Sequence, residues 1–185
     1  QKTINLKIMA NNFNFLVSTS RFNEINARAE LWFTFLICGD RYSIISSLEF
    51  QGLLTAFTVL RKEDVIFKIK DLLKKDPNFF QYILKIVPID FVCETDIEVI
   101  QEIIQRHHKE YIKEEESFRI ELKRRNNEII NRTQLIKVVA EIFSNKVDLD
   151  NPDKIIRIEI LGNFCGISFL QLNDIIKAPK ESHEI

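Results

Sequence analysis

Residues that could contact phosphate groups cluster between Glu116 and Arg125. Phe118, Ile120 and Leu122 alternate there with charged residues, and successive side chains along a β-strand point to opposite faces. The segment is therefore predicted to be a strand with one apolar face and one charged, mainly basic face. From Arg119 to Arg125 four bases stand against one acid, a balance that favours phosphate contact. A solvated strand face would explain the same charges.

The segment before this strand has the opposite charge. From Pro88 to Glu116 nine acids stand against three bases, although the net charge of the 185-residue chain is only -1. The sequence pI near 6.4 argues against a broad polyanion-binding surface, but it leaves room for one focused basic patch. The acidic segment from Asp90 to Glu116 could instead make the chain a protein-interaction module, or it could be a solvated helix face.

The sequence offers no recognisable catalytic or metal-binding constellation. Its four glycines are scattered and match no phosphate-binding loop. His107 and His108 are neighbours on a predicted helix and point about 100° apart, so they cannot share one metal ion. The third histidine, His183, is remote in sequence, and Cys93 has no neighbouring base that would stabilise a thiolate. We therefore expect no catalytic residue, no cofactor and no metal ion.

Composition indicates an ordinary soluble protein. Hydrophobic residues make up 45% and charged residues 29%, and the length suits one good core or two small subdomains. The three cysteines are far apart and form no Cys-x-x-Cys pair, and no apolar run approaches the roughly 18 residues of a membrane span. We therefore expect a cytoplasmic protein with reduced thiols and no membrane association.

The first part of the chain is predicted to contain four strands and two helices in the order strand, helix, strand, strand, helix, strand. The expected ranges are 14–18, 20–38, 42–48, 53–60, 62–75 and 79–86. Five apolar residues of the first helix recur every three or four positions and are predicted to form its buried stripe: Phe22, Ile25, Ala29, Trp32 and Leu36. The second helix should end before Asp76-Pro77. This order indicates a ferredoxin-like arrangement.

A second unit follows, opened by Thr95 and Glu98, which match a capping box. The helix behind it should run to about Tyr111. The elements expected after that helix are the basic strand, a helix over 134–143 opened by Asn131 or Thr133, a short strand and turn over 147–153, strands over 155–161 and 164–170, and a closing element over 174–178. The last two strands are predicted to form a hairpin around Gly162 and Asn163.

Two motifs of this unit carry a family resemblance. Ser117-Phe118-Arg119 leads into Lys123-Arg124-Arg125, and after a helix comes Lys146-Val147-Asp148-Leu149 with Asn151-Pro152-Asp153. With these motifs the second unit, from about Phe80 to Ala178, resembles a THUMP domain, and the first unit resembles the ferredoxin-like domain that precedes it. The expected fold class is α+β. A ferredoxin-like domain over residues 1–79, with its last strand at about 79–87 at the junction, is followed by a THUMP α/β domain over 80–185.

The resemblance implies that the chain binds tRNA and delivers it to a modifying enzyme. The chain ends at Ile185 without room for a catalytic domain, so we expect a non-catalytic adaptor. It is similar to the stand-alone adaptor for N4-acetylation of cytidine in the tRNA D-arm, which works with a separate tRNA acetyltransferase. The alternative is the substrate-binding fragment of a THUMP-containing tRNA thiolase or methyltransferase.

Cations on and around the basic strand are the candidate RNA contacts, because phosphate oxygens are bound by Lys and Arg. The candidates are Lys85, Arg119, Lys123, Arg124, Arg125, Lys137, Lys146, Lys154 and Arg157. Asp148 and Asp153 would repel phosphate, so the motif that contains them is assigned to the fold, where its Asn-Pro-Asp turn reverses the chain.

Overall fold

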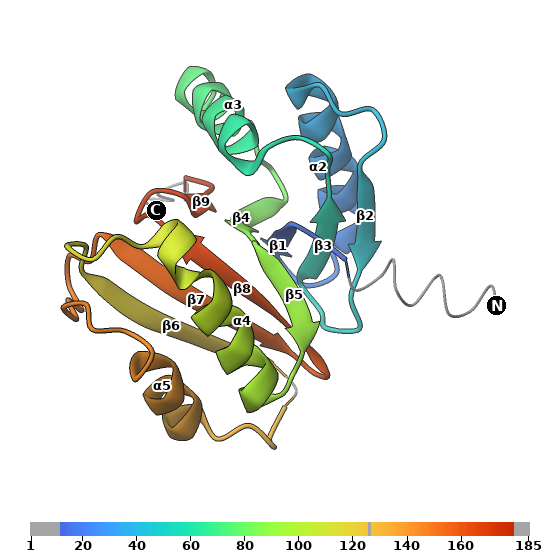
Figure 1. The fold of residues 1–185 in the computed structure, drawn as a ribbon. Coiled ribbons are helices and arrows are strands. Elements are labelled where there is room, and N and C mark those ends of the chain that lie inside the picture. The colour runs from blue at the N-terminus through green and yellow to red at the C-terminus, as the bar shows by residue number, and fades with distance from the viewer. Residues whose placement is uncertain (1–11, 126, 180–185) are drawn as a thin grey trace, which may run out of the picture. The chain divides into compact units, whose positions relative to one another are not determined.

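The computed structural model describes residues 12–125 and 127–179, which form four helices and two sheets (Figure 1). The chain divides into two compact units. The first comprises Phe13–Pro88 and the described residues from Asp174 onward, and the second comprises Ile89–Asn173. The predicted α+β class, with a ferredoxin-like order followed by a second α/β unit, is confirmed.

The first unit contains the predicted alternation of strands and helices. Its elements are β1 (Phe15–Thr19), α2 (Glu24–Cys38), β2 (Ile44–Ser47), β3 (Leu53–Phe57), α3 (Lys62–Lys75), β4 (Ile83–Pro88) and β9 (Ile176–Lys177). The sheet order is β2-β3-β1-β4-β9, and every neighbouring pair is antiparallel. The expected closing element is therefore β9, which returns from the far end of the chain to complete this sheet.

The buried face of α2 differs from the predicted stripe. The helix begins at Glu24, so Phe22 lies outside it, and Ile25 is 84% exposed. The side chains that α2 buries are those of Ala27, Leu31, Thr34, Phe35 and Cys38. The prediction was wrong because α2 is apolar around most of its circumference. Spacings of three and four therefore fit two different faces, and only packing selects between them.

The second unit packs two helices on one face of a four-stranded sheet (Figure 1). Its elements are β5 (Phe91–Glu94), α4 (Ile97–Tyr111), β6 (Phe118–Arg125), α5 (Arg132–Ala140), β7 (Lys154–Leu161) and β8 (Phe164–Leu170). The sheet order is β5-β8-β7-β6, with β6 and β7 parallel and the other pairs antiparallel. The parallel pair requires a crossover connection, and α5 supplies it. The sequence did not predict β5.

Alternate residues of the strands form the core beneath α4 and α5. Phe118 and Leu122 are buried on this face, which confirms the predicted apolar face of β6. The core around them is built mainly from branched aliphatic residues: Ile100, Ile104, Leu135, Val139, Ile156, Ile158, Ile160 and Ile167. Burial of this apolar face also determines which side chains of β6 point to the opposite face, because a one-residue slip of β6 would move its charged side chains into the core.

Asp96, not Thr95, caps α4. The Asp96 carboxylate accepts hydrogen bonds from the backbone N–H groups of Glu98 at 2.8 Å and Val99 at 3.1 Å. The Thr95 hydroxyl is buried and has no hydrogen-bond partner among the described residues. The helix ends at Tyr111, so the acids from Glu114 to Glu116 lie in the turn before β6 rather than on a helix face.

The corrected cap is tested by two substitutions one residue apart. Asp96→Ala should lower the free energy of unfolding by about 1 kcal/mol, because it leaves two N-terminal amides unsatisfied. Thr95→Val should be neutral or stabilising, since it replaces an unpartnered hydroxyl with a methyl group of similar shape. Urea unfolding of both variants measures the difference. A larger loss for Thr95→Val than for Asp96→Ala would contradict the assignment.

Candidate nucleic-acid interface

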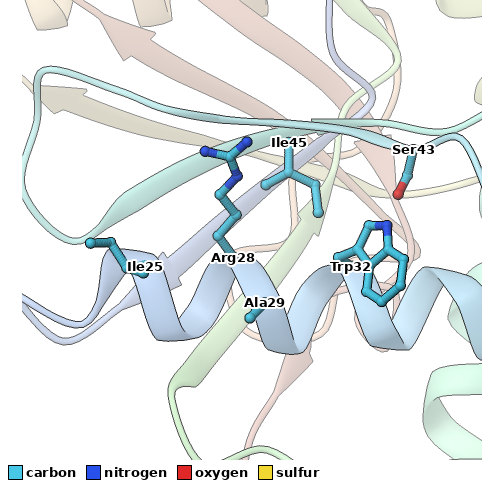
Figure 2. A pocket seen from close by; sticks show the side chains of 6 residues that line it. All are labelled: Ile25, Arg28, Ala29, Trp32, Ser43 and Ile45. Carbon is cyan, nitrogen blue, oxygen red and sulfur yellow. The ribbon is translucent and has the colours of Figure 1, made fainter.

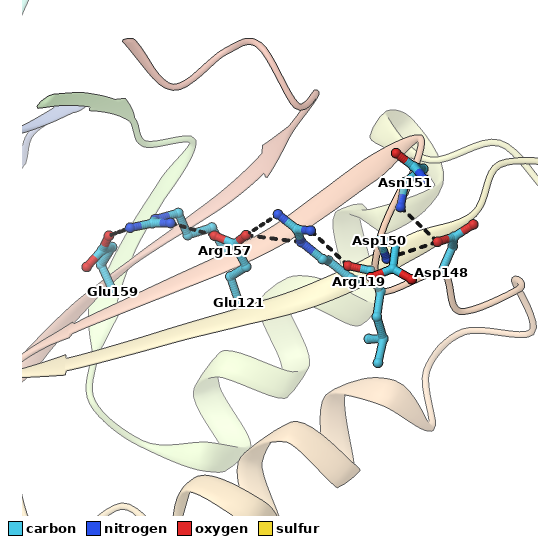
Figure 3. A network of polar contacts seen from close by, with 8 residues as sticks. Arg119, Glu121, Asp148, Asp150, Asn151, Arg157 and Glu159 are labelled. Atoms are coloured by element: carbon cyan, nitrogen blue, oxygen red, sulfur yellow. Dashed lines mark hydrogen bonds and ion pairs between the residues drawn. The ribbon is translucent and has the colours of Figure 1, made fainter. Parts of the chain in front are cut away.

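Four charged side chains form an alternating ladder on the sheet face opposite the helices (Figure 3). In the parallel register Glu121 of β6 lies beside Arg157 of β7. Glu121 accepts from Arg119 at 2.6 and 3.1 Å and from Arg157 at 2.5 Å. Arg157 also donates to Glu159 at 2.7 Å, so the order is Arg119, Glu121, Arg157, Glu159. We call these four residues the charge ladder.

Each anion of the charge ladder is held by a cation. Burial raises the pKa of Glu121, but the hydrogen bonds and charges of Arg119 and Arg157 outweigh burial and lower that pKa below its usual value. Arg157 is only 4% exposed and Glu159 is equally buried, which is tolerable because the two charges contact each other. The ladder as a whole carries no net charge.

The charge ladder changes the interpretation of two predicted RNA contacts. Arg157 is buried and its guanidinium is shared between Glu121 and Glu159, so it presents no surface to a phosphate. Arg119 is partly exposed, yet it donates to Glu121 and to the Leu149 carbonyl at 2.9 Å. We infer that the two arginines stabilise the pairing of β6 with β7 and that Arg119 also holds the loop that contains Leu149.

Two acids of the loop from Val147 to Asp153, Asp148 and Asp153, accept hydrogen bonds from the chain itself; Figure 3 shows those of Asp148. The Asp148 carboxylate accepts from the backbone N–H groups of Asn151 at 2.9 Å and Asp150 at 3.1 Å, which lowers its pKa. The pKa of Asp153 is lowered by the backbone N–H and then the hydroxyl of Ser117, both at 2.8 Å. The motif therefore closes the loop onto the start of β6. The expected short strand is reduced to one bridge between Val147 and Phe118.

Two predicted cations, Lys123 and Arg125, continue the ladder face toward the end of β6. Both are exposed, and neither has an ion-pair partner within residues 12–125 and 127–179. Arg124 points to the opposite side, where its guanidinium donates to the Ile130 carbonyl at 3.0 Å while the residue stays exposed. Since β6 is an edge strand of its sheet, this basic end faces solvent beyond the last strand.

Two of the remaining candidates lie at the other end of β6. Lys146 and Lys154 lie beside Phe118 at the start of β6, which is about 23 Å from Arg125 for an extended strand. Lys154 is half-buried and 4.0 Å from the Glu116 carboxylate, whereas Lys146 is exposed. Lys137 is exposed on α5, and Lys85 is half-buried on β4 of the first unit.

Histidines and cysteines of the second unit serve packing. The His107 ring stacks on Phe91 with centroids 4.5 Å apart, and the sulfurs of Cys93 and Cys165 are 3.3 Å apart on neighbouring strands. The described part of the chain contains no cluster of three or more side chains that could hold a metal ion. None of its helices is long and apolar enough to cross a membrane. His183 lies outside the described residues.

Sequence reasoning missed the two acids of the charge ladder. Glu121 and Glu159 were not singled out, although each stands two positions from an arginine on a predicted strand. That spacing places an acid and a base on one face of a strand, so a pairing signal was present. The partner strand of each was not known, and the parallel register that joins the two pairs requires the structure.

Most of the second unit matches a known protein family. Residues 94–170 match the THUMP domain family. The match covers 77 of the 185 residues. THUMP domains bind RNA in tRNA-modifying enzymes. The match confirms the resemblance carried by the motifs on either side of α5.

Two relatives align with parts of this chain. THUMP domain-containing protein 1 of Homo sapiens is 26% identical over 133 residues, covering 63% of this chain and 38% of the relative. A probable tRNA sulfurtransferase of Malacoplasma penetrans is 38% identical over 96 residues, covering 46% of this chain and 24% of the relative. The chain therefore spans well under half the length of either protein.

The fold extends across both units in a solved structure. The crystal structure of PH1313 from Pyrococcus horikoshii matches 90% of this chain and 56% of its own, with a TM-score of 0.66 and 20% identity. At this identity the likeness concerns the fold. It shows that the fold seen in the two units also occurs in another protein.

Glu121→Gln tests the charge ladder through its pH dependence. The variant should lose about 2 kcal/mol of unfolding free energy at pH 7, because Arg119 and the buried Arg157 lose their shared anion. Since the pKa of Glu121 is lowered by folding, its carboxylate stabilises the protein above its unfolded pKa, and this contribution disappears as pH falls through the folded pKa. The difference from the parent should therefore shrink below about pH 4.

The control is Glu128→Gln, because Glu128 is exposed and makes no ion pair within the described residues. It should change stability by less than about 0.5 kcal/mol at either pH. Chemical unfolding at pH 7 and at pH 3.5 measures both variants. A stability difference for Glu121→Gln that is unaffected by pH would show that the ladder is not electrostatic in origin.

Proposed function

We propose that this chain binds tRNA through the exposed cations at the end of β6. The principal residues are Lys123, Arg124 and Arg125, with Lys137, Lys146 and the half-buried Lys154 as further phosphate contacts. The observation that carries the proposal is the exposure of these cations on a THUMP domain whose neighbouring strand acids are neutralised. Phosphate contact requires an uncompensated positive charge that RNA can reach.

The charge ladder gives this proposal a physical basis. An unpaired Glu121 beside Lys123 would reduce the local positive potential and repel phosphate. Because Glu121 is shared by two arginines, its carboxylate does not compete for the cations beyond it. The potential is thus focused at one end of an edge strand, which suits a protein whose net charge is -1.

The finer proposal is a cytoplasmic, non-catalytic adaptor that presents tRNA to a separate acetyltransferase, which forms N4-acetylcytidine in the D-arm. It rests on the relation to THUMP domain-containing protein 1 and on the roles of the described His and Cys side chains, which the fold uses for packing. Positioning requires contacts with the RNA backbone and no reacting group of the adaptor's own.

The second candidate is the substrate-binding part of a larger tRNA-modifying enzyme. The similarity to a probable tRNA sulfurtransferase over 96 residues supports it. Both candidates share the same RNA-binding surface and differ in whether the catalytic domain belongs to the same polypeptide. The length of the natural gene product distinguishes them.

Lys123→Ala combined with Arg125→Ala tests the RNA-binding surface. The double variant should bind unmodified tRNA at least about tenfold more weakly at low salt. The slope of log K against log salt should decrease by roughly one unit for each lost phosphate contact. Filter binding or fluorescence anisotropy over a salt series measures both quantities. The loss should be similar for different tRNAs, because phosphate contacts carry no base sequence.

The matched control is Lys70→Ala with Lys74→Ala, which removes the same charge from exposed positions on α3 of the first unit. It should leave tRNA affinity within about twofold, because neither lysine belongs to the proposed phosphate contacts. Equal losses for the two double variants would mean that net charge, rather than the β6 site, controls binding. Unchanged binding of Lys123→Ala with Arg125→Ala would place the RNA elsewhere.

Reconstitution tests the adaptor role. The chain mixed with tRNA and acetyl-coenzyme A should transfer no acetyl group, whereas addition of a tRNA cytidine acetyltransferase should yield N4-acetylcytidine. The Lys123→Ala, Arg125→Ala variant should restore less product than the parent at limiting protein. Nucleoside mass spectrometry provides the measurement. Acetylation by the chain alone would refute the adaptor proposal, and acetylation that never depends on the chain would refute the partnership.

A further inference from the structure

A cleft between α2 and β2 in the first unit has no role in the proposed RNA binding. Its volume is about 420 Å³ (Figure 2). The residues that line it are Ile25, Arg28, Ala29, Trp32, Ser43 and Ile45. Figure 2 shows the Trp32 ring and the Arg28 side chain rising from α2 toward the strand, with Ile45 pointing down between them. We call this the α2–β2 cleft.

The helix that forms this cleft is apolar on the side that faces solvent. Ile25 is 84% exposed and Trp32 is 47% exposed, and Phe33 and Ile37 extend the apolar surface along the helix. A helix that is apolar on both sides normally packs on both sides. Exposed contiguous apolar surface, with Trp and Arg as its largest members, is typical of protein–protein contact sites.

Strand β2 adds a second recognition element. It lies at the edge of the described sheet and pairs with β3 only, so its other side is open to a further strand. Because side chains alternate along a strand, Ser43 and Ile45 both face α2. A peptide added to β2 would therefore send alternate side chains toward the cleft.

Charge identifies the kind of partner. The acids of α2 accept hydrogen bonds from the backbone of the chain itself. Glu24 accepts from the Gly52 N–H at 2.6 Å, and Glu30 accepts from three backbone N–H groups between Gln81 and Ile83. Asp40 is buried and accepts from the Thr58 hydroxyl at 2.5 Å. Arg28, which lines the cleft, is exposed and forms no ion pair within the described residues. The same holds for Arg21, which precedes α2, and Arg41, which precedes β2.

We propose that the α2–β2 cleft binds an extended segment of another protein whose cleft-facing side chains are apolar and acidic. The segment pairs with the open edge of β2, inserts an apolar side chain against Trp32, and places carboxylates beside the arginines. The strand edge and the single aromatic ring in the lining favour a peptide over RNA, for which stacked aromatic surfaces and a continuous basic groove are typical. The proposal does not depend on RNA binding by the THUMP domain.

Trp32 is the only tryptophan of the chain, so its fluorescence reports occupancy of the cleft directly. The probes are two synthetic eight-residue peptide libraries with Thr at alternate positions. The positions between hold Leu, Val, Asp or Glu in the acidic library and Leu, Val, Lys or Arg in the basic library. The acidic library should shift Trp32 emission to shorter wavelength, and the basic library should leave it unchanged.

Three variants define the site. Arg28→Glu should weaken binding of the acidic library by about tenfold and strengthen binding of the basic one, because it reverses the charge at the cleft. Ile25→Ser should weaken binding of the acidic library by a similar factor. Phe67→Ser is the matched control, since Phe67 is 74% exposed on α3 and lies outside the cleft, and it should have no effect.

Several results would overturn the proposal. Equal binding of both libraries, or no emission shift with either, would exclude an acidic peptide. An Arg28-dependent shift with tRNA would assign the cleft to nucleic acid. A shift that follows protein concentration and a doubling of mass in light scattering would assign it to a second copy. Short-wavelength emission without any probe would mean that the chain covers the cleft itself.

Discussion

The parallel pairing of β6 with β7 is the constraint on which the second unit depends. It places Glu121 beside Arg157 and so joins two local pairs of charges into the charge ladder. The core on the other side of the sheet holds that register, since a slip of one residue would exchange the charged and apolar faces. A parallel pair needs a crossover, and α5 provides one while covering the apolar face.

This arrangement separates the charges of β6 into two functions. Arg119 and Glu121 stabilise the sheet, whereas Lys123 and Arg125 remain in solvent. The exposed pair also lies on an edge strand, where Lys and Arg discourage pairing with another chain. The same residues thus oppose self-association and provide charge for the proposed phosphate contacts, so their presence alone does not reveal RNA binding. Salt dependence separates the two roles, because edge protection requires no bound polyanion.

The order of elements followed from sequence wherever a local signal was strong. Asp76-Pro77 ended α3 at its predicted position, and the hairpin of β7 and β8 formed around Gly162 as expected. Features that depend on tertiary contacts could not be predicted from the sequence. The buried state of Arg157 depends on neighbours distant in sequence, and β5 is a four-residue strand without a distinctive pattern. The exposure of Lys123 could be predicted from its place near the end of a strand. The burial of Arg157 could not, because its partner Glu121 lies on another strand and only the register of β6 with β7 brings the two together.

One strand has a consequence for the order in which the protein forms during synthesis. β9 completes the first sheet by pairing Ile176 with Ile86 and Lys177 with Lys85. Between β4 and β9 the chain builds the whole second unit. On a ribosome, β4 therefore emerges about 90 residues before its outer partner, so that side of the strand stays unpaired while the second unit is made. The first sheet is thus completed only after the second unit has been synthesised.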